Sequence, residues 1–324
     1  MKHSEELRQK PILRPLFRIR DGFMEITGLF KLKAKIKNYF FLKRLVREDE
    51  LRKKQIAKQI CELPSNMLTL SAKSPNVVVS MTSYGERVNS SAAYALYSIL
   101  TQKQLPNRIV LNLDQERWNN ENIPQLLKHL QRAGVEINFC EDVGPHTKLL
   151  PALRKFPNDI IITTDDDIYY DDTLVSELFD GFNQSDKRSV ICRDGKYICK
   201  HNGAYLPYSR NPHCNEKCND EIVSVIPFGV GGVLYPPHVF SDEIFNKDVF
   251  RELCRFADDV WFGIMELREC INIIYLRINS RDKSIPVDRE ISYSWTDSRN
   301  LMFLNDTLGK NDEQYAALLK YYKM

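Results

Sequence analysis

Residues 160–170 read IIITTDDDIYY, so an apolar, β-branched run ends abruptly in three carboxylates, Asp165, Asp166 and Asp167. Such a run is typical of a strand buried on both faces of a parallel sheet, which would deliver the charges to the sheet edge. Like charges packed this closely resist joint ionisation. A divalent cation backed by phosphate would relieve that cost, because Mg²⁺ is usually held by one or two carboxylates plus substrate phosphates. A solvated turn is the alternative, since Asp favours turns.

The charge of the chain is unevenly distributed. The 324 residues are 43% hydrophobic, enough for a sizeable core, and their formal net charge is +3. Residues 1–60 carry 17 Lys and Arg against 7 Asp and Glu, a balance of +10, so the remainder balances at −7. A basic arm on an acidic body predicts that the two parts meet different partners.

The arm is expected to be helical over residues 29–60, because Lys, Arg, Leu and Glu dominate and no Pro interrupts. Residues 30–46 read FKLKAKIKNYFFLKRLV, a basic and aromatic make-up that suits an anionic membrane surface. Packing on the body or on another subunit is the alternative. Nucleic acid is not expected as a partner, since no recognition motif accompanies the charge.

Cellular location follows from what the sequence lacks. There is no apolar leader and no apolar run of about 18 residues, and eight cysteines are too few for a disulfide framework in a chain of this length. The sequence therefore predicts a cytoplasmic protein, peripheral at the inner face of the membrane if the arm binds lipid.

Strands and helices are expected to alternate after residue 76, which predicts a parallel α/β sheet with right-handed crossovers. Strands are expected at residues 77–82, 108–114, 135–139 and 160–164, and helices at 91–102, 123–133 and 149–156. Ligands of such sheets bind outside the carboxyl ends of the strands. Thr82, Asp114 and the Asp triplet all fall at that edge.

A family resemblance rests on four stretches in order: VVVSMTSYGERV at 77–88, TTDDD at 163–167, FGVGGVLY at 228–235 and FADDVWFG at 256–263. Residues 76–265 resemble GT-A-fold, DxD-containing nucleotide-sugar glycosyltransferases. The resemblance implies an α/β, Rossmann-like fold with a mostly parallel central sheet flanked by helices, preceded by the basic helical arm.

The resemblance also implies a division of the chain. We expect an arm, a linker rich in Pro, Ser and Asn, a GT-A catalytic domain with a nucleotide-binding half and an acceptor half, and a helical tail. The respective ranges are 1–62, 63–75, 76–295 (halves 76–170 and 171–295) and 296–324.

The donor side of the site is implied by the DxD match. Asp167, with Asp165, would hold Mn²⁺ or Mg²⁺ against the donor diphosphate, while Asp165 and Asp166 face the nucleotide. The remaining nucleotide-sugar contacts implied are Thr82, Tyr84, Arg87, Asp114 and Lys148. Lys148 could equally be a surface lysine at a helix start. The last histidine of the chain is His238, which precedes the acid pair, so no late histidine completes the metal shell, and diphosphate and water are expected to complete it.

The acceptor side is implied by the two later stretches. Gly231 and Gly232 would let acceptor and donor sugar approach the backbone, although a tight turn needs the same residues. Asp259 matches the general base that takes the proton of the attacking hydroxyl, and Asp258 matches its neighbour, which raises the pKa of the base and holds the acceptor. The alternative for this pair is a helix cap, because acids favour first turns.

The implied activity is metal-dependent, inverting transfer of a sugar from a nucleotide-sugar, expected to be UDP-linked, to a hydroxyl of a glycan or a lipid-linked acceptor. Synthesis of a bacterial surface polysaccharide fits such an enzyme. The alternatives are another metal-dependent phosphate enzyme, a phosphatase or phosphotransferase, or a non-enzymatic adaptor anchored by the arm. A phosphatase using Asp165 as nucleophile would carry Thr or Val where Tyr169 stands. A zinc site at Cys199, His201, Cys214 and Cys218 stays open.

Overall fold

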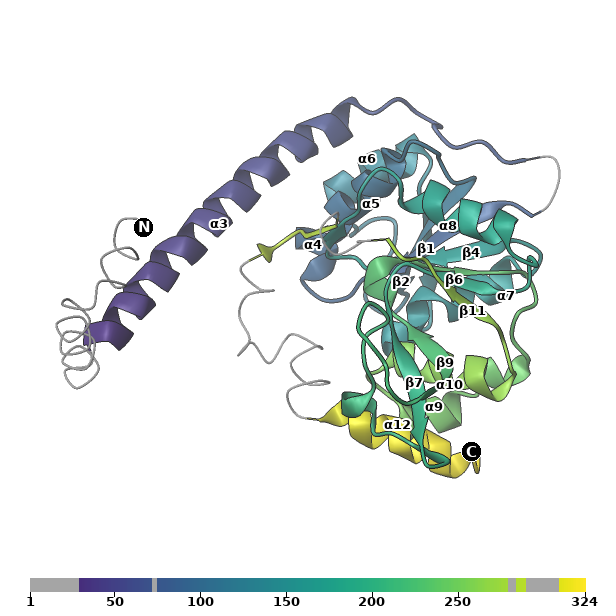
Figure 1. Cartoon of the computed structure of the whole chain (residues 1–324). Helices are drawn as coiled ribbons and strands as arrows, with labels where there is room; N and C mark the ends of the chain where they lie inside the picture. The colour runs from purple at the N-terminus through teal and green to yellow at the C-terminus, as the bar shows by residue number, and fades with distance from the viewer. Residues whose placement is uncertain (1–28, 72–74, 279–283, 290–308) are drawn as a thin grey trace. The chain divides into compact units, whose positions relative to one another are not determined.

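The computed structural model describes residues 29–71, 75–278, 284–289 and 309–324. The chain divides into two compact units, Met1–Leu51 and Arg52–Met324. Helix α3, Leu29–Glu62, runs through the described part of the first unit and into the second, which confirms the helix predicted over 29–60 (Figure 1). The predicted linker 63–75 and tail 296–324 lie partly outside the described residues, and the domain boundaries stay predictions.

The second unit is built on a seven-stranded sheet in the order β11-β6-β10-β4-β1-β2-β3. Only β10 runs antiparallel to its neighbours, so the sheet is mostly parallel, as predicted. The strands are β1 (Val77–Thr82), β2 (Arg108–Asp114), β3 (Glu136–Cys140), β4 (Ile160–Thr163), β6 (Val190–Cys192), β10 (Val233–Tyr235) and β11 (Ile273–Tyr275).

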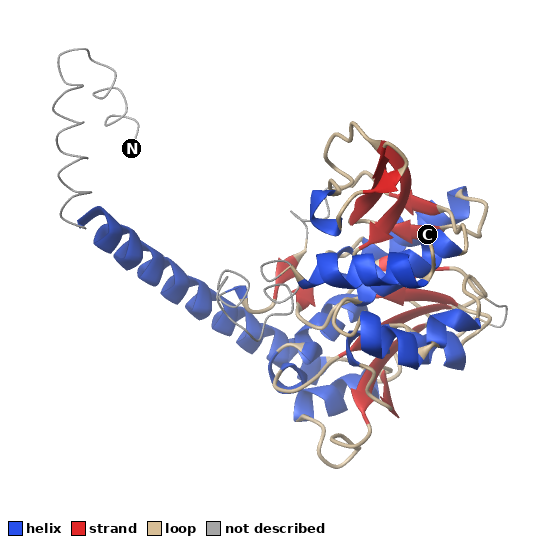
Figure 2. Ribbon diagram, turned by 90° about the horizontal axis from the view of Figure 1, so that it is seen from below, coloured by secondary structure: helices blue, strands red, loops and turns tan. Residues whose placement is uncertain are grey.

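Helices cover both faces of this sheet (Figures 1 and 2). One face packs on α5 (Ala92–Leu100), α6 (Gln125–Ala133) and α8 (Leu174–Gln184). The other packs on α7 (Leu150–Lys155), α9 (Lys247–Leu253) and α10 (Asp258–Arg268), and α12 (Lys310–Tyr321) packs on α9 and α10. The strands therefore sit in the middle of a three-layer unit.

Strand β4 explains why residues 160–162 are apolar at every position. Ile160 and Ile162 pack in the core under α5 and α8, whereas Ile161 packs in the core on the opposite face. All three are at most 1% exposed. Because successive strand residues point to opposite faces, a strand buried on both sides needs an unbroken hydrophobic run. The buried strand predicted before the Asp triplet is confirmed.

The remaining elements are two smaller sheets and several short helices. A three-stranded sheet joins β8 (Ala204–Tyr205), β7 (Gly195–His201) and β9 (Glu221–Pro227), and a two-stranded sheet joins β5 (Ile168–Tyr169) to β12 (Ile285–Pro286). The short helices are α4 (Arg87–Ser90), η1 (Gly144–Lys148), η2 (Tyr208–Arg210), η3 (Gly229–Gly231) and η4 (Asp242–Phe245). No helix in the described ranges is long and apolar enough to cross a membrane.

Gly232 offers a test of the packing between β10 and α8. Its φ is +83°, and a Cβ added to it would lie 2.6 Å from Leu174 Cδ1. We predict that Gly232→Ala lowers the free energy of unfolding by about 3 kcal/mol, because positive-φ strain and overpacking each cost about 1–3 kcal/mol. Urea denaturation followed by circular dichroism measures this loss.

Gly203 is the matched control, because its φ is +81° and a Cβ there would meet nothing within 4 Å. Gly203→Ala should therefore cost only the strain, about 1 kcal/mol. Equal losses in the two variants would contradict the close packing of Gly232 on Leu174.

Candidate active site

The Asp triplet lies directly after β4, at the carboxyl ends of the parallel strands, where ligands of such sheets bind. Its first member pairs with a buried lysine: Lys148 Nζ lies 2.7 Å from Asp165 Oδ1. The same nitrogen lies 2.9 Å from Asp258 Oδ2, at the start of α10. One ammonium group therefore joins the Asp triplet to the acid pair, two motifs far apart in the sequence.

A second cation organises the other side of the triplet. Arg87 Nη1 lies 3.0 Å from Asp166 Oδ1, and Arg87 Nη2 lies 3.0 Å from Asp167 Oδ2. Ser83 Oγ donates to Asp166 Oδ2 at 2.5 Å. The side chain of Asp166 is 5% exposed, against 26% for Asp165 and 37% for Asp167. Asp166 thus holds the loop after β1, and Asp167 is the carboxylate that a ligand can most readily reach.

Lys148 is held in place by its backbone as well as by its charge. It ends η1, and its carbonyl accepts a hydrogen bond of 2.6 Å from Ser80 Oγ on β1. The Ser80 hydroxyl in turn accepts from Asn112 Nδ2 on β2 at 3.0 Å, and Asn112 Oδ1 accepts from Asn138 Nδ2 on β3 at 2.9 Å. A line of polar side chains across three strands therefore fixes the segment that presents the lysine.

His146, two residues earlier in η1, is fully buried and stacks on Phe250 of α9 with ring centroids 4.4 Å apart. Burial lowers the pKa of His146 to about 4, so the imidazole is neutral at physiological pH. It anchors η1 in the core between β1 and α9. Lys148 is therefore a buried residue and not the surface lysine that the sequence allowed.

The acid pair occupies the first turn of α10 without capping it. The N-cap residue is Ala257, and no side chain caps the helix. Asp258 forms an ion pair with Lys148, while Asp259 Oδ1 accepts a hydrogen bond of 3.1 Å from the backbone N–H of Gly229 in η3. Both acids of this first turn therefore contact other elements, Asp258 through an ion pair and Asp259 through a hydrogen bond, and their roles stay predictions.

The protonation equilibria of the site are shifted by burial. Burial, reinforced by the charge of Asp258, raises the pKa of Asp259 to about 8 although Lys148 opposes the shift. Burial also raises the pKa of Asp167 and of Asp166, with Arg87 opposing it in both cases. The pKa of Lys148 lies well above its ordinary value, because the attraction of Asp165 and Asp258 outweighs desolvation. Lys148 is therefore a permanent cation, whereas Asp259 titrates near neutral pH.

Three other predicted donor-side residues lie at the same sheet edge but outside the ion-paired cluster. Thr82 Oγ1 donates to the Asn112 carbonyl at 3.1 Å, and Asp114 accepts from the backbone N–H of Glu116 and pairs with Arg117 Nε at 3.3 Å. Tyr84 is 45% exposed, with the Arg87 guanidinium 5.3 Å from its ring centroid. Their roles stay predictions.

The glycines after β9 divide into two kinds. A Cβ on Gly231 would lie 2.7 Å from Asp194 Cβ, and one on Gly232 would meet Leu174, so both predicted glycines pack against protein. A Cβ on Gly229 would lie 2.5 Å from Lys148 Nζ, 3.2 Å from Asp165 Oδ1 and 3.4 Å from Asp259 Oδ1. Gly229 is therefore the glycine that borders the charged cluster.

Three residues of the site were not predicted from the sequence: Gly229, Ser83 and Tyr170. The Tyr170 hydroxyl accepts a hydrogen bond of 2.8 Å from the backbone N–H of Asp165 and so orients the triplet. Tyr170 stands in the opening stretch, but an aromatic residue after a strand gives no sign of its partner. The FGVGG run pointed to the correct segment without distinguishing its glycines.

The predicted metal ligands fit only part of a coordination shell. Within the residues that the structure describes, no group of three or more His, Cys, Asp and Glu side chains is arranged to hold a metal ion. Asp165 and Asp167 are carboxylates, the ligands that Mg²⁺ and Mn²⁺ prefer, and each faces a cation, Lys148 or Arg87. This donor set fits an ion completed by phosphate oxygens and does not fit an all-protein cage.

The described residues also form no zinc site. Cys199 Sγ and Cys218 Sγ lie 3.2 Å apart, but His201 pairs with Asp220, and the four side chains do not form a metal-binding group. His238 also lies elsewhere, with Nε2 2.9 Å from Asn158 Oδ1.

No family model and no curated protein matches this chain. Among solved structures, CMP:2-keto-3-deoxy-manno-octonic acid synthetase complexed with CTP is similar at 13% identity and a TM-score of 0.39, over 63% of this chain and 90% of that chain. The 4-diphosphocytidyl-2C-methyl-D-erythritol synthase of Anaerococcus prevotii is similar at 11% identity and a TM-score of 0.42, over 72% of this chain and 99% of that one.

A third similar structure is S. aureus TarS 1-349 in complex with UDP, at 14% identity and a TM-score of 0.41, over 77% of this chain and 72% of that chain. At such identities and TM-scores, no property of those proteins is carried over to this chain.

The raised pKa of Asp259 predicts how stability varies with pH. The folded protein keeps a proton on this group that the unfolded chain, with a pKa of 3.8, has lost, so its contribution to stability is complete below about pH 4 and is lost as pH rises towards 8. Asp259→Asn cannot titrate. We therefore expect the variant to gain stability relative to wild type as pH rises from about 5 to about 8.

Urea denaturation at several pH values in this window measures the difference. Asp172→Asn is the control, because Asp172 is exposed and pairs with Lys103 outside the cluster; its difference from wild type should be nearly constant. A constant difference for Asp259→Asn as well would show that Asp259 titrates normally.

Proposed function

We propose that this chain is a metal-dependent glycosyltransferase that moves a sugar from a nucleotide-sugar, UDP-linked in our proposal, to a hydroxyl of a glycan or lipid-linked acceptor. One observation carries the proposal: Lys148 pairs with both Asp165 and Asp258, so the strand-end triplet and the α10 acid pair belong to one site. Metal-and-phosphate chemistry and base chemistry can then act on the same substrate.

The donor would lie on the triplet side. Lys148 and Arg87 are the cations nearest to the triplet, and guanidinium groups bind phosphate through paired hydrogen bonds. Asp167, the most exposed of the three acids, and Asp165 would hold Mn²⁺ or Mg²⁺ together with the donor diphosphate. When bound, the ion would supply Lewis-acid stabilisation of the departing nucleoside diphosphate.

The acceptor would lie on the Asp259 side. With Oδ1 engaged by the Gly229 N–H, Asp259 Oδ2 takes the proton of the acceptor hydroxyl as its oxygen bonds to the anomeric carbon. The bond from that carbon to the diphosphate oxygen breaks in the same displacement, so the configuration inverts and the nucleoside diphosphate leaves. A pKa of about 8 suits this role, because a general base works best when its pKa lies near the operating pH.

The deciding experiment measures turnover of a panel of nucleotide-sugars, including UDP-linked hexoses, with Mn²⁺, with Mg²⁺ and with EDTA. We expect metal-dependent release of nucleoside diphosphate from at least one donor. Asp259→Asn should lower kcat by about 10²–10⁴-fold with little change in the donor KM, since proton transfer is lost while donor contacts remain. Asp167→Asn should lower kcat/KM by about tenfold or more.

Asp172→Asn should retain wild-type rates, because Asp172 pairs with Lys103 and does not belong to the ion-paired cluster of Lys148 and Arg87. Absence of turnover and of metal-dependent binding for every donor would refute the glycosyltransferase. Release of inorganic phosphate from a phosphate ester, lost in the Asp165→Asn variant, would instead support the phosphatase alternative.

A membrane partner is also proposed for the arm. Tyr39 and Phe40 of α3 are 59% and 64% exposed, and residues 29–47 contain seven Lys and Arg but no Asp or Glu. Aromatic rings favour the headgroup region, and each basic residue near an anionic surface contributes about 1 kcal/mol. The proposed location is the inner face of the membrane, next to a lipid-linked acceptor.

Flotation of the full chain with vesicles tests this partner. Binding is expected to vesicles with anionic phospholipid and to fall at high salt. Lys37→Glu combined with Lys43→Glu should weaken it by about tenfold or more. The matched control reverses Lys320 and Lys323, two exposed lysines near the C-terminus, and should bind like wild type. Equal binding by the two double variants would contradict the arm as the attachment site.

A further inference from the structure

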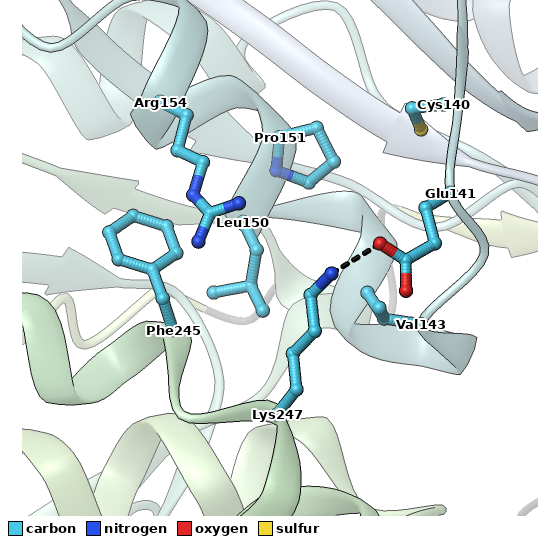
Figure 3. Close-up of a pocket in the computed structure, with 8 residues that line it drawn as sticks. All are labelled: Cys140, Glu141, Val143, Leu150, Pro151, Arg154, Phe245 and Lys247. Atoms are coloured by element: carbon cyan, nitrogen blue, oxygen red, sulfur yellow. Dashed lines mark hydrogen bonds and ion pairs between the residues drawn. The ribbon is translucent and has the colours of Figure 1, made fainter.

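A hollow of about 200 Å³, here called the Arg154 hollow, lies apart from the charged cluster (Figure 3). Its apolar floor consists of Val143, Leu150 and Pro151, from the loop before η1 and from α7. Arg154 of α7 and Phe245 of η4 form one wall, and Lys247 of α9 and Glu141 form the opposite one. Residues from both predicted halves of the domain, 76–170 and 171–295, therefore line the hollow.

The rim carries more positive than negative charge. Lys247 and Arg251 both pair with the carboxylate of Glu141, the latter through Nη2 at 2.8 Å from Oε1, and together they lower the pKa of that acid. Among the residues that line the hollow, two cations, Arg154 and Lys247, thus stand against one carboxylate, Glu141. Asp142 accepts from its own loop and Lys155 pairs with Glu136.

Arg154 is the distinctive member of this rim. Its guanidinium lies 4.4 Å from the ring centroid of Phe245, so it stacks on an aromatic face, and no acid in the described part of the chain forms an ion pair with it. A stacked guanidinium is already oriented, and it keeps its hydrogen-bond donors for a planar anion. Figure 3 shows these nitrogens directed over the apolar floor.

We propose that the Arg154 hollow binds a small monoanion with a flat apolar body, of the chemical class of aromatic carboxylates. The body packs on Leu150 and its apolar neighbours, and the carboxylate pairs with Arg154 and Lys247. The volume suits this class, because a cavity of about 150 Å³ accommodates benzene whereas drug-sized ligands need about 300 Å³ or more. An inorganic anion would gain nothing from the apolar floor, so phosphate is excluded as the preferred ligand.

Fluorine NMR titration of the full chain with 4-fluorobenzoate tests the proposal, with uncharged 4-fluorobenzamide as the matched probe. Saturable binding of the benzoate is expected, and the benzamide should bind about tenfold more weakly or not at all, since it carries no negative charge to pair with Arg154 and Lys247. Arg154→Gln and, separately, Lys247→Gln should each weaken benzoate binding, the former by about tenfold.

Lys155→Gln is the matched control, because Lys155 neighbours Arg154 on α7 but does not line the hollow, and its affinity should stay within about twofold of wild type. Circular dichroism confirms that each variant is folded, and Lys247 provides a second reading if Arg154→Gln unfolds. The proposal is overturned if wild type shows no saturable binding, if the benzamide binds equally well, or if Lys155→Gln weakens binding as much as the rim variants do.

Discussion

The ion pairs of Lys148 are the interaction on which the site depends. A buried carboxylate without a partner costs several kcal/mol, and at this edge of the sheet five acids, of which Asp166 and Asp258 are buried, surround two cations. Lys148 compensates one acid from the triplet and one from α10, so its removal would leave charge uncompensated in both halves of the unit. The hydrogen bond from Ser80 and the buried His146 matter because they keep this single nitrogen between its partners.

Strands β1, β2 and β4 could be predicted because each is a short continuous run that is buried on both faces. The runs at 77–79 and 160–162 are wholly apolar, and such runs have few alternatives to a central strand. The antiparallel strand β10 could not be predicted, because three residues are too few to show the alternation of apolar and polar side chains. Its direction follows from its pairing with β4 and β6, which lie far away in the sequence. The short helix α4 was also not predicted, and Arg87 at its start pairs with Asp166.

The candidate site was predictable as a set of motifs and not as a set of contacts. Carboxylates after an apolar strand and at a helix start can be recognised in a sequence. The cation that pairs with both of them cannot, because its contacts join residues far apart in the chain. In the sequence, Gly229 and Gly232 cannot be told apart, since any glycine allows the same backbone conformations. The atoms that an added Cβ would meet distinguish them: Gly229 borders the charged cluster, whereas Gly232 packs on Leu174.

The pairing of β5 with β12 has a consequence for the order in which the site can form on the ribosome. The backbone N–H of Val287 donates to the carbonyl of Asp167 at 2.7 Å, and Lys148 meets Asp258 only after α10 has been synthesised. A nascent chain ending before these segments contains the triplet and its first cation but lacks the strand that pairs beside it. Co-translational folding can therefore pair strands β1 to β4 early, whereas Lys148 can pair with Asp258 only once α10 has emerged.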